Sequence, residues 1–171
     1  MSIILYLGVD LHEKFHPISD AVHILAYIAI FKNTNCLSST AIRNSVKTNP
    51  SNIRKIMGLL KKAQLIQTIN GQTHPTLNKN VNTITLYDIY KSLENKDDLF
   101  LVDTTTDQKC VIGGNIQKVL QEEYDHLQAV VEEEMKHITL GNILQKLALL
   151  EKEESRKGKT RAYSKILSDR T

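Results

Sequence analysis

The sequence predicts a mainly helical protein with one small β-ribbon. Three observations support this fold class. Apolar residues recur at helical spacing over most of the chain, an alternating segment at 65–69 precedes the turn signal Asn70-Gly71, and several helix starts carry capping residues. The 171 residues are 41% apolar and 24% charged, a composition typical of one globular domain, with or without a helical extension.

Two helices are expected in the N-terminal third of the chain. Ser19 is the predicted cap of the first, which is apolar on most sides and is therefore expected to be buried. Ser38 and Ser39 open a short second helix, and the polar stretch 47–49 ends it.

The third helix, at 50–63, has the clearest start in the chain. Asn49 suits the N-cap, and Pro50 suits the first helical position, where a missing N–H costs nothing. Apolar residues then follow at helical spacing, and the opposite face is polar and basic.

A two-stranded ribbon is expected next, with strands at 65–69 and 75–77 joined through Asn70-Gly71. Thr85 and Asp88 then form a capping box that opens a fourth helix.

The C-terminal half is expected to begin with a polar connector at 95–109. A long helix at 115–137, about 35 Å in length, keeps its apolar residues on one stripe. Thr139 opens a last helix. From Glu151 onward the sequence is charged and loses its periodicity, which predicts a frayed tail.

Charge is strongly segregated along the chain, although the net charge is only +3. No Asp or Glu occurs in the 67 residues from Ala21 to Tyr87, which contain eight Lys and Arg. Residues 88–154 carry fifteen acids and seven Lys. Because a duplex presents one negative charge per ~1.7 Å of its axis, the acid-free basic segment favours nucleic acid as the partner.

Other classes of protein lack support in the sequence. The apolar run at 2–9 is shorter than the ~20 residues of a membrane span and has no secretory cleavage site, so we expect a cytoplasmic protein without a membrane partner. Cys36 and Cys110 form no zinc-binding or disulfide pattern. No nucleotide-binding or nucleophile motif occurs, so we expect neither an enzyme nor a cofactor nor a metal site.

Two short helices joined by a polar turn and followed by a ribbon are the elements of a winged helix-turn-helix. In that motif the second helix enters the major groove of DNA. Asn52 can bind adenine bidentately and Arg54 can bind guanine bidentately, while Lys47, Lys55 and Lys62 are better placed for phosphates.

At this point the residues resemble the Rrf2 family of bacterial winged-helix transcriptional regulators. The resemblance covers about Ile18 to Leu144 and rests on four blocks in a fixed order. They are ISDAVHILAYIAIF, LSSTAIRNSVKTNPSNIRKIMGLLKKAQLI, ITLYDIYKSLE, and CVIGGNIQKVLQEEYDHL followed by HITLGNIL. The resemblance implies a homodimer in which two long C-terminal helices cross and two heads bind a partly palindromic operator.

The resemblance also implies positions for the contacts with DNA. Base contacts fall on the start of the third helix and wing contacts on the ribbon. Together with flanking polar and basic residues, the expected DNA-binding set is Ser39, Thr40, Asn49, Ser51, Asn52, Arg54, Lys55, Lys62, Thr68, Asn70, Gly71 and Gln72.

The chain departs from the family pattern in the wing and the connector. Many members carry Arg-Gly at the wing tip, where this chain has Asn70-Gly71. Members that bind an iron-sulfur cluster place three cysteines in the connector. This chain has only Cys110 there, so it looks like the YwnA-like branch, which lacks the cluster. Cys110 is a candidate redox thiol, although an inert or partly buried thiol is favoured because only Lys109 adjoins it.

The long helix is the expected dimerisation element, because it exceeds what a small head can cover. Its predicted contact residues are Ile116, Leu120, Leu127, Val130 and Val131. The expected division of the chain is an N-terminal extension at 1–17, a winged helix-turn-helix domain at 18–95, connector and dimerisation helices at 96–150, and a flexible tail at 151–171.

The sequence therefore predicts a dimeric, sequence-specific regulator that binds double-stranded DNA through the helix at 50–63 and acts most simply as a repressor. A protein partner or a small-molecule effector is compatible with this prediction. The alternative is a winged-helix protein that acts mainly by docking onto a protein partner. The substituted wing motivates that alternative.

Overall fold

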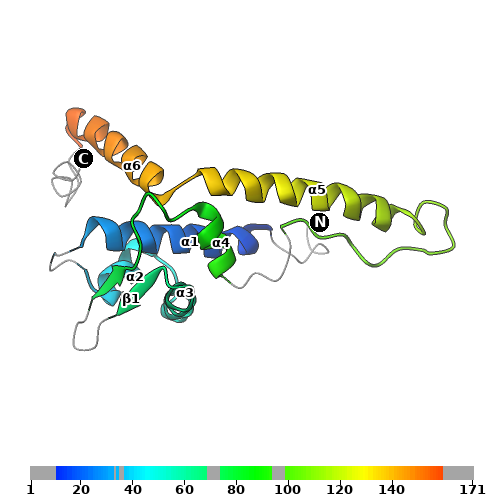
Figure 1. Ribbon diagram of the computed structural model, residues 1–171, viewed down its shortest axis with the longest axis horizontal. Helices are drawn as coiled ribbons and strands as arrows, with labels where there is room; N and C mark the ends of the chain where they lie inside the picture. The colour runs from blue at the N-terminus through cyan, green and yellow to red at the C-terminus, as the bar shows by residue number, and fades with distance from the viewer. Residues whose placement is uncertain (1–10, 33, 35–36, 69–73, 94–98, 160–171) are drawn as a thin grey trace, which may run out of the picture.

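The computed structural model describes residues 11–32, 34, 37–68, 74–93 and 99–159, with side chains from Pro17 onward. The described residues between 17 and 93 form a globular part, here called the head, and residues 99–137 form a long projection, here called the arm (Figure 1). The elements in chain order are α1 (Leu11–Ile30), α2 (Ser39–Val46), α3 (Pro50–Lys62), β1 (Ile66–Thr68), β2 (Pro75–Leu77), α4 (Leu86–Ser92), α5 (Ile116–His137) and α6 (Leu140–Arg156). The predicted fold class, mainly α with one small ribbon, is confirmed.

The head is built around α1, which contacts α2, α3, β2, α4 and α6. Ile24, Leu25 and Ile28 are almost fully buried at its centre, as predicted for a helix that is apolar on most sides. The predicted cap at Ser19 is wrong, because α1 begins at Leu11 and continues through Pro17. A proline inside a helix removes one backbone hydrogen bond but does not always end the helix.

The helix-turn-helix follows the predicted capping chemistry. The Ser38 side chain accepts a hydrogen bond from the backbone N–H of Ala41 and so caps α2. Lys47 ends α2 in the left-handed conformation, with φ of 55°. Asn49 caps α3, and Pro50 occupies its first position.

The ribbon follows α3 along the chain. β1 and β2 pair antiparallel, with Ile66 opposite Leu77 and Thr68 opposite Pro75. Ile66 of β1 and Pro75 of β2 are buried, whereas the other two residues of β1 are exposed, so both strands contribute to the packing of the ribbon. The predicted turn at Asn70-Gly71 lies outside the described residues.

A short backbone pairing joins the head to the corner between α5 and α6. Thr85 and Thr139 form an antiparallel bridge. On either side of it, the N–H of Leu86 donates to Ile138 O and the N–H of Leu140 donates to Ile84 O, both at 2.8 Å. Thr85 and Thr139 are also the N-caps of α4 and α6, and each heads a capping box.

Close packing surrounds this junction. The backbone N–H of Gly141 donates to Val81 O at 3.0 Å. A Cβ atom at position 141 would collide with the side chain of Asn82. Glycine therefore allows α6 to start against the loop that precedes α4.

α4 holds the base of the arm. Gln128 of α5 donates to the Tyr90 hydroxyl at 3.1 Å and to Glu132 at 2.7 Å. Lys91 bonds Glu132 at 3.0 Å and lies over the Tyr87 ring. The hydrogen bond from Lys91 to Glu132 raises the pKa of the lysine.

The connector doubles back along α5 in the arm (Figure 1). The backbone N–H of Leu99 donates to Gln128 at 2.9 Å, and the Gln117 side chain donates to the carbonyl of Asp103 at 3.1 Å. The rings of Phe100 and Tyr124 lie 5.9 Å apart between them. The arm thus consists of α5 and an extended segment of the connector that packs against it.

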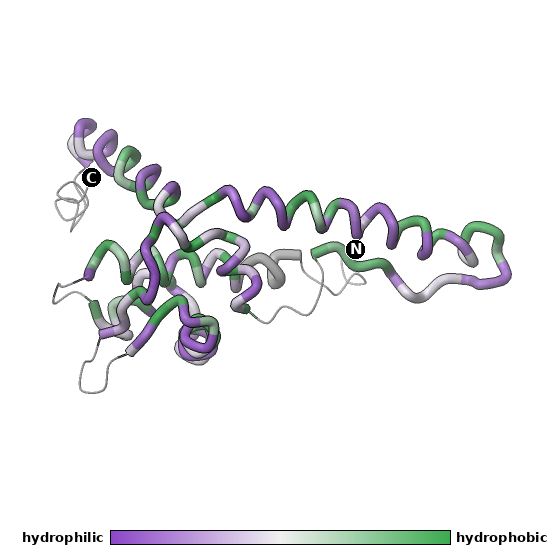
Figure 2. The backbone as a smooth tube through the Cα atoms, viewed as in Figure 1, coloured by the Kyte–Doolittle hydropathy of each residue, from purple (hydrophilic) through white to green (hydrophobic). Residues whose placement is uncertain are grey.

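α5 alternates between hydrophilic and hydrophobic segments along its length (Figure 2). None of its 22 residues is buried. No helix in the described part of the chain combines the length and the apolar character that crossing a membrane requires.

α6 is longer than the sequence indicated. It runs to Arg156, so the tail expected from Glu151 onward is wrong for the residues up to that point. Five of the six residues at 151–156 are Glu, Lys or Arg, which favour a helix even though the apolar periodicity is lost, and Glu151 is 8% exposed. Residues 160–171 lie outside the described residues.

The burial of His23 in α1 makes the stability of the head depend on pH. His23 Nε2 lies 2.9 Å from Ser45 Oγ, and burial lowers the pKa of His23 below its usual 6.5 against an opposing pull from Asp20. A histidine with a lowered pKa binds its proton more tightly in the unfolded chain. Its contribution to the free energy of unfolding is therefore complete above pH 6.5 and is lost as the pH falls below that value.

We expect the wild-type protein to lose more thermal stability than His23→Gln when the pH is lowered from about 7.5 to about 5.5. The glutamine can still bond Ser45 but does not titrate. Circular dichroism measures the fall in Tm of each protein, and the larger fall is expected for the wild type. Equal pH dependence in the two proteins would contradict the assignment.

Candidate DNA-binding surface

The first two turns of α3 present a polar face to solvent. Ser51, Arg54 and Lys55 are exposed, whereas Ile53 and Ile56 are buried in the core. Residues three and four apart share one side of a helix, so the three exposed side chains form one surface. The structure therefore brings together three of the predicted base and phosphate contacts.

Asn49 has a structural role at the start of this surface. Its side-chain oxygen accepts hydrogen bonds from the backbone N–H of Ser51 at 2.7 Å and of Asn52 at 3.4 Å. The oxygen is thus engaged in capping α3, as the sequence predicted.

The side chain of Asn52 points toward α1 and the turn before α3. Its amide nitrogen donates to Asp20 Oδ2 at 2.9 Å and to Thr48 Oγ1 at 3.2 Å. An asparagine amide has two N–H donors, and both are used here. Bidentate binding of adenine needs one of these donors, so this arrangement does not offer the contact that the sequence suggested for Asn52.

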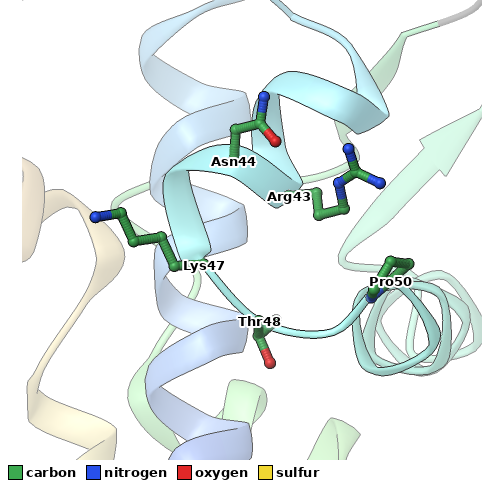
Figure 3. Close-up of a pocket in the computed structure, with 5 residues that line it drawn as sticks. All are labelled: Arg43, Asn44, Lys47, Thr48 and Pro50. Atoms are coloured by element: carbon green, nitrogen blue, oxygen red, sulfur yellow. The ribbon is translucent and has the colours of Figure 1, made fainter.

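A shallow groove of about 420 Å³ lies beside the start of α3. It is lined by Arg43, Asn44, Lys47, Thr48 and Pro50. The Arg43 side chain extends toward the Pro50 end of α3, and Lys47 extends away from it on the other side of the turn (Figure 3). Arg43 and Asn44 were absent from the predicted set because only the fold places α2 beside the first turn of α3.

Three further predicted contacts flank this surface. Ser39 and Thr40 are exposed in the first turn of α2, and Lys62 is exposed at the last position of α3. All three lie in the helix-turn-helix but outside the first two turns of α3.

The wing is only partly described. Thr68, at the end of β1, is exposed and accepts a hydrogen bond from Lys61 Nζ at 2.8 Å. This bond ties the last turn of α3 to the ribbon. The other predicted wing residues, Asn70, Gly71 and Gln72, lie outside the described residues.

The charged residues of the head up to Tyr87 are almost all positive. From Pro17 to Tyr87 the sequence contains a single acid, Asp20, and its residue is only 9% exposed. Arg43, Lys47, Arg54 and Lys55 are all exposed around the start of α3. Exposed cations without neighbouring exposed acids create the positive potential that binding to phosphates requires.

Apolar side chains remain in contact with solvent on the arm. Leu127 is 43% exposed and Val130 is 53% exposed, while Ile116, Leu120 and Val131 are half-buried. At 100° per residue, Leu127 and Val130 lie on a side of α5 that its contacts with α4 and the connector do not cover. The predicted dimerisation residues thus divide between intramolecular packing and an exposed strip.

Cys110 lies in the turn between the connector and α5 and is exposed. Hydrogen bonds from the backbone N–H groups of Gly113 and then Ile112 lower the pKa of its thiol. The expectation of a partly buried thiol is therefore wrong, because the turn leaves the side chain in solvent. Cys36 lies outside the described residues.

The profile of the Rrf2 family, described as iron-dependent transcriptional regulators, matches residues 17–146. The chain is also 32% identical over 127 residues to the HTH-type transcriptional regulator YwnA of Bacillus subtilis (strain 168), which covers 74% of this chain and 93% of YwnA. These relatives are transcriptional regulators and not enzymes.

The residues of this chain do not fit the iron that the family description mentions. Iron–sulfur clusters are held mainly by cysteine thiolates, and the whole sequence has two cysteines. The described residues contain no group of three or more His, Cys, Asp or Glu side chains that could hold a metal ion.

Solved structures agree with the family match. A crystal structure reported as a DNA-binding protein is 28% identical, with a TM-score of 0.60, and the match covers 75% of this chain and 98% of that one. CymR, the global cysteine regulator of Bacillus subtilis, shares the fold at 17% identity and a TM-score of 0.54, over 74% of this chain and 91% of CymR. The winged helix-turn-helix head, its basic surface and these relatives agree, and the chain belongs to the Rrf2 family of DNA-binding transcriptional regulators.

Proposed function

We propose that the protein is a homodimeric, sequence-specific regulator that inserts α3 into the major groove and represses transcription by occupying a promoter in the cytoplasm. The observation that carries this proposal is the exposed face of Ser51, Arg54 and Lys55 at the start of α3. The N-terminal turns of a recognition helix are the part that reaches base edges. Arginine is the side chain best suited to guanine, and serine can bond to several bases.

The groove beside α3 supports the same orientation. With α3 in the major groove, α2 crosses the sugar-phosphate backbone. Arg43 and Lys47 would then meet phosphates, together with Ser39 and Thr40 at the other end of α2. Contacts of this kind fix the position of the protein on the duplex without selecting a sequence.

The arm supports the homodimer. α5 has 22 residues and is about 33 Å long, and it projects from the head with none of its residues buried (Figure 1). Leu127 and Val130 form an exposed apolar strip that a second copy of α5 can cover. Crossed arms would place two heads on the two halves of an operator.

DNA binding is tested by selecting duplexes from a random pool with the purified protein. We expect the selected duplex to bind at least about a thousandfold more tightly than random duplex. Affinity should fall with salt at a log–log slope of about −0.9 per phosphate neutralised. Fluorescence anisotropy over a salt series measures both. A flat salt response would favour docking onto a protein partner instead.

The division between base contacts and phosphate contacts is tested at opposite ends of α3. Arg54→Ala should weaken binding to the selected duplex by about 1–3 kcal/mol and leave binding to random duplex much less affected. Lys62→Ala should weaken both and reduce the salt slope by about one. Lys109→Ala, in the arm, is the control and should change neither. Identical effects of Arg54→Ala and Lys62→Ala on the two duplexes would refute the division.

The dimer is tested by Leu127→Glu, which places a charge on the exposed strip of α5. We expect the dimer to dissociate at concentrations at least about tenfold higher than for the wild type, because a leucine worth about 1.5–3 kcal/mol of burial is replaced by a charge. Sedimentation velocity measures this. Gln121→Glu adds the same charge on the other side of α5 and should leave the dimer intact. A monomeric wild type would rule out the crossed arms.

A further inference from the structure

The amide of Asn52 belongs to a polar cluster between α1, the helix-turn-helix turn and α3. Asp20 Oδ2 lies 2.9 Å from Asn52 Nδ2, and Thr48 Oγ1 lies 3.2 Å from the same nitrogen. The three residues come from α1, from the turn between α2 and α3, and from α3, and Asp20 and Asn52 are 32 positions apart. The cluster therefore fixes the first turn of α3 against α1.

Asp20 is a charged residue in a largely buried position, with 9% of the residue exposed. Burying a charged side chain has a cost that an apolar side chain at the same place would avoid. The hydrogen bond that Asp20 accepts from the Asn52 amide is charge-assisted and so stronger and more directional than a neutral one. What the carboxylate provides beyond packing is a defined orientation of the amide.

The same turns of α1 also hold α2. His23, three residues after Asp20, lies 2.9 Å from Ser45 Oγ near the end of α2. α1 thus contacts both helices of the helix-turn-helix through polar side chains. Polar contacts fix rotation and translation along a helix more sharply than apolar packing, because a hydrogen bond weakens steeply with misalignment.

We propose that Asp20 is a positioning residue for sequence recognition. It holds Asn52, and through it the first turn of α3, at the angle from which Ser51 and Arg54 reach base edges. This inference rests on the proposed insertion of α3 into the major groove. Asp20 itself touches no base and acts only through Asn52.

Because Asp20 is an acid, its removal distinguishes an electrostatic effect on DNA binding from a loss of positioning. Removing an acid from a DNA-binding head strengthens binding to every duplex if only electrostatics matter. Loss of positioning instead weakens the selected duplex alone. The two explanations therefore predict opposite signs for Asp20→Ala on the selected duplex.

The experiment measures the affinities of the full-length protein for a duplex selected by the wild type and for a random duplex, over a salt series. We expect Asp20→Ala to lower the ratio of the two affinities about tenfold, with an unchanged salt slope. Asp20→Asn keeps an oxygen that can accept from Asn52, and should keep the ratio within about threefold of the wild type. Asp103→Ala removes an exposed acid from the connector and should leave the ratio unchanged.

Coupling between the two residues gives a second readout. Asn52→Ala should lower the ratio as much as Asp20→Ala, and the double variant should be no worse than either single variant. Additive losses would overturn the proposal. If Asp20→Ala does not fold, Asp20→Asn and Asn52→Ala still decide, since a ratio kept in Asn52→Ala contradicts positioning through that amide.

The outcomes separate this inference from the function on which it rests. If the wild type discriminates between the duplexes but Asp20→Ala keeps the same ratio, the positioning role is wrong and the proposed function stands. If the wild type itself shows no discrimination, the proposed function fails, and the positioning role fails with it.

Discussion

The backbone pairing of Thr85 with Thr139 is the constraint on which the shape of the molecule depends. It joins the starts of α4 and α6 at one point, and α5 ends immediately before it. The backbone bonds from Leu86 to Ile138 and from Leu140 to Ile84 would break if the two segments slid past each other. A capping box within each helix satisfies further N–H groups at its start. The direction in which the arm leaves the head follows from this pairing and from the contacts of α4 with Gln128 and Glu132.

The features that sequence predicted well are those fixed by neighbouring residues. Asn49-Pro50 and the capping box from Thr85 to Asp88 are local chemistry, and the structure has both helices starting where these residues indicated. The starts and ends that failed, at Ser19 and Glu151, lie where a helix continues past a local signal for its boundary. Whether a helix continues past a proline or a charged run depends on surroundings that a window of sequence does not contain.

The candidate site divides in the same way. Ser51, Arg54 and Lys55 were predictable because helical spacing alone puts them on one face. The partner of Asn52 was not, since Asp20 lies 32 residues earlier in the chain and only the packing of α1 against α3 brings the two together. Arg43 and Asn44 were missed for the same reason. A polar residue at the start of a recognition helix can serve the protein or the DNA, and its long-range contacts decide which.

The doubled construction of the arm has a mechanical consequence. A single helix bends readily, but here the connector is bonded to α5 at Gln117 and Gln128, so bending must also stretch or break those bonds. In the proposed dimer the arm then works as a rigid spacer whose length sets the distance between the two heads. The length of α5 would then set the spacing between the two halves of the operator. Adding or removing one helical turn of α5 would move one head out of register with the groove that it contacts.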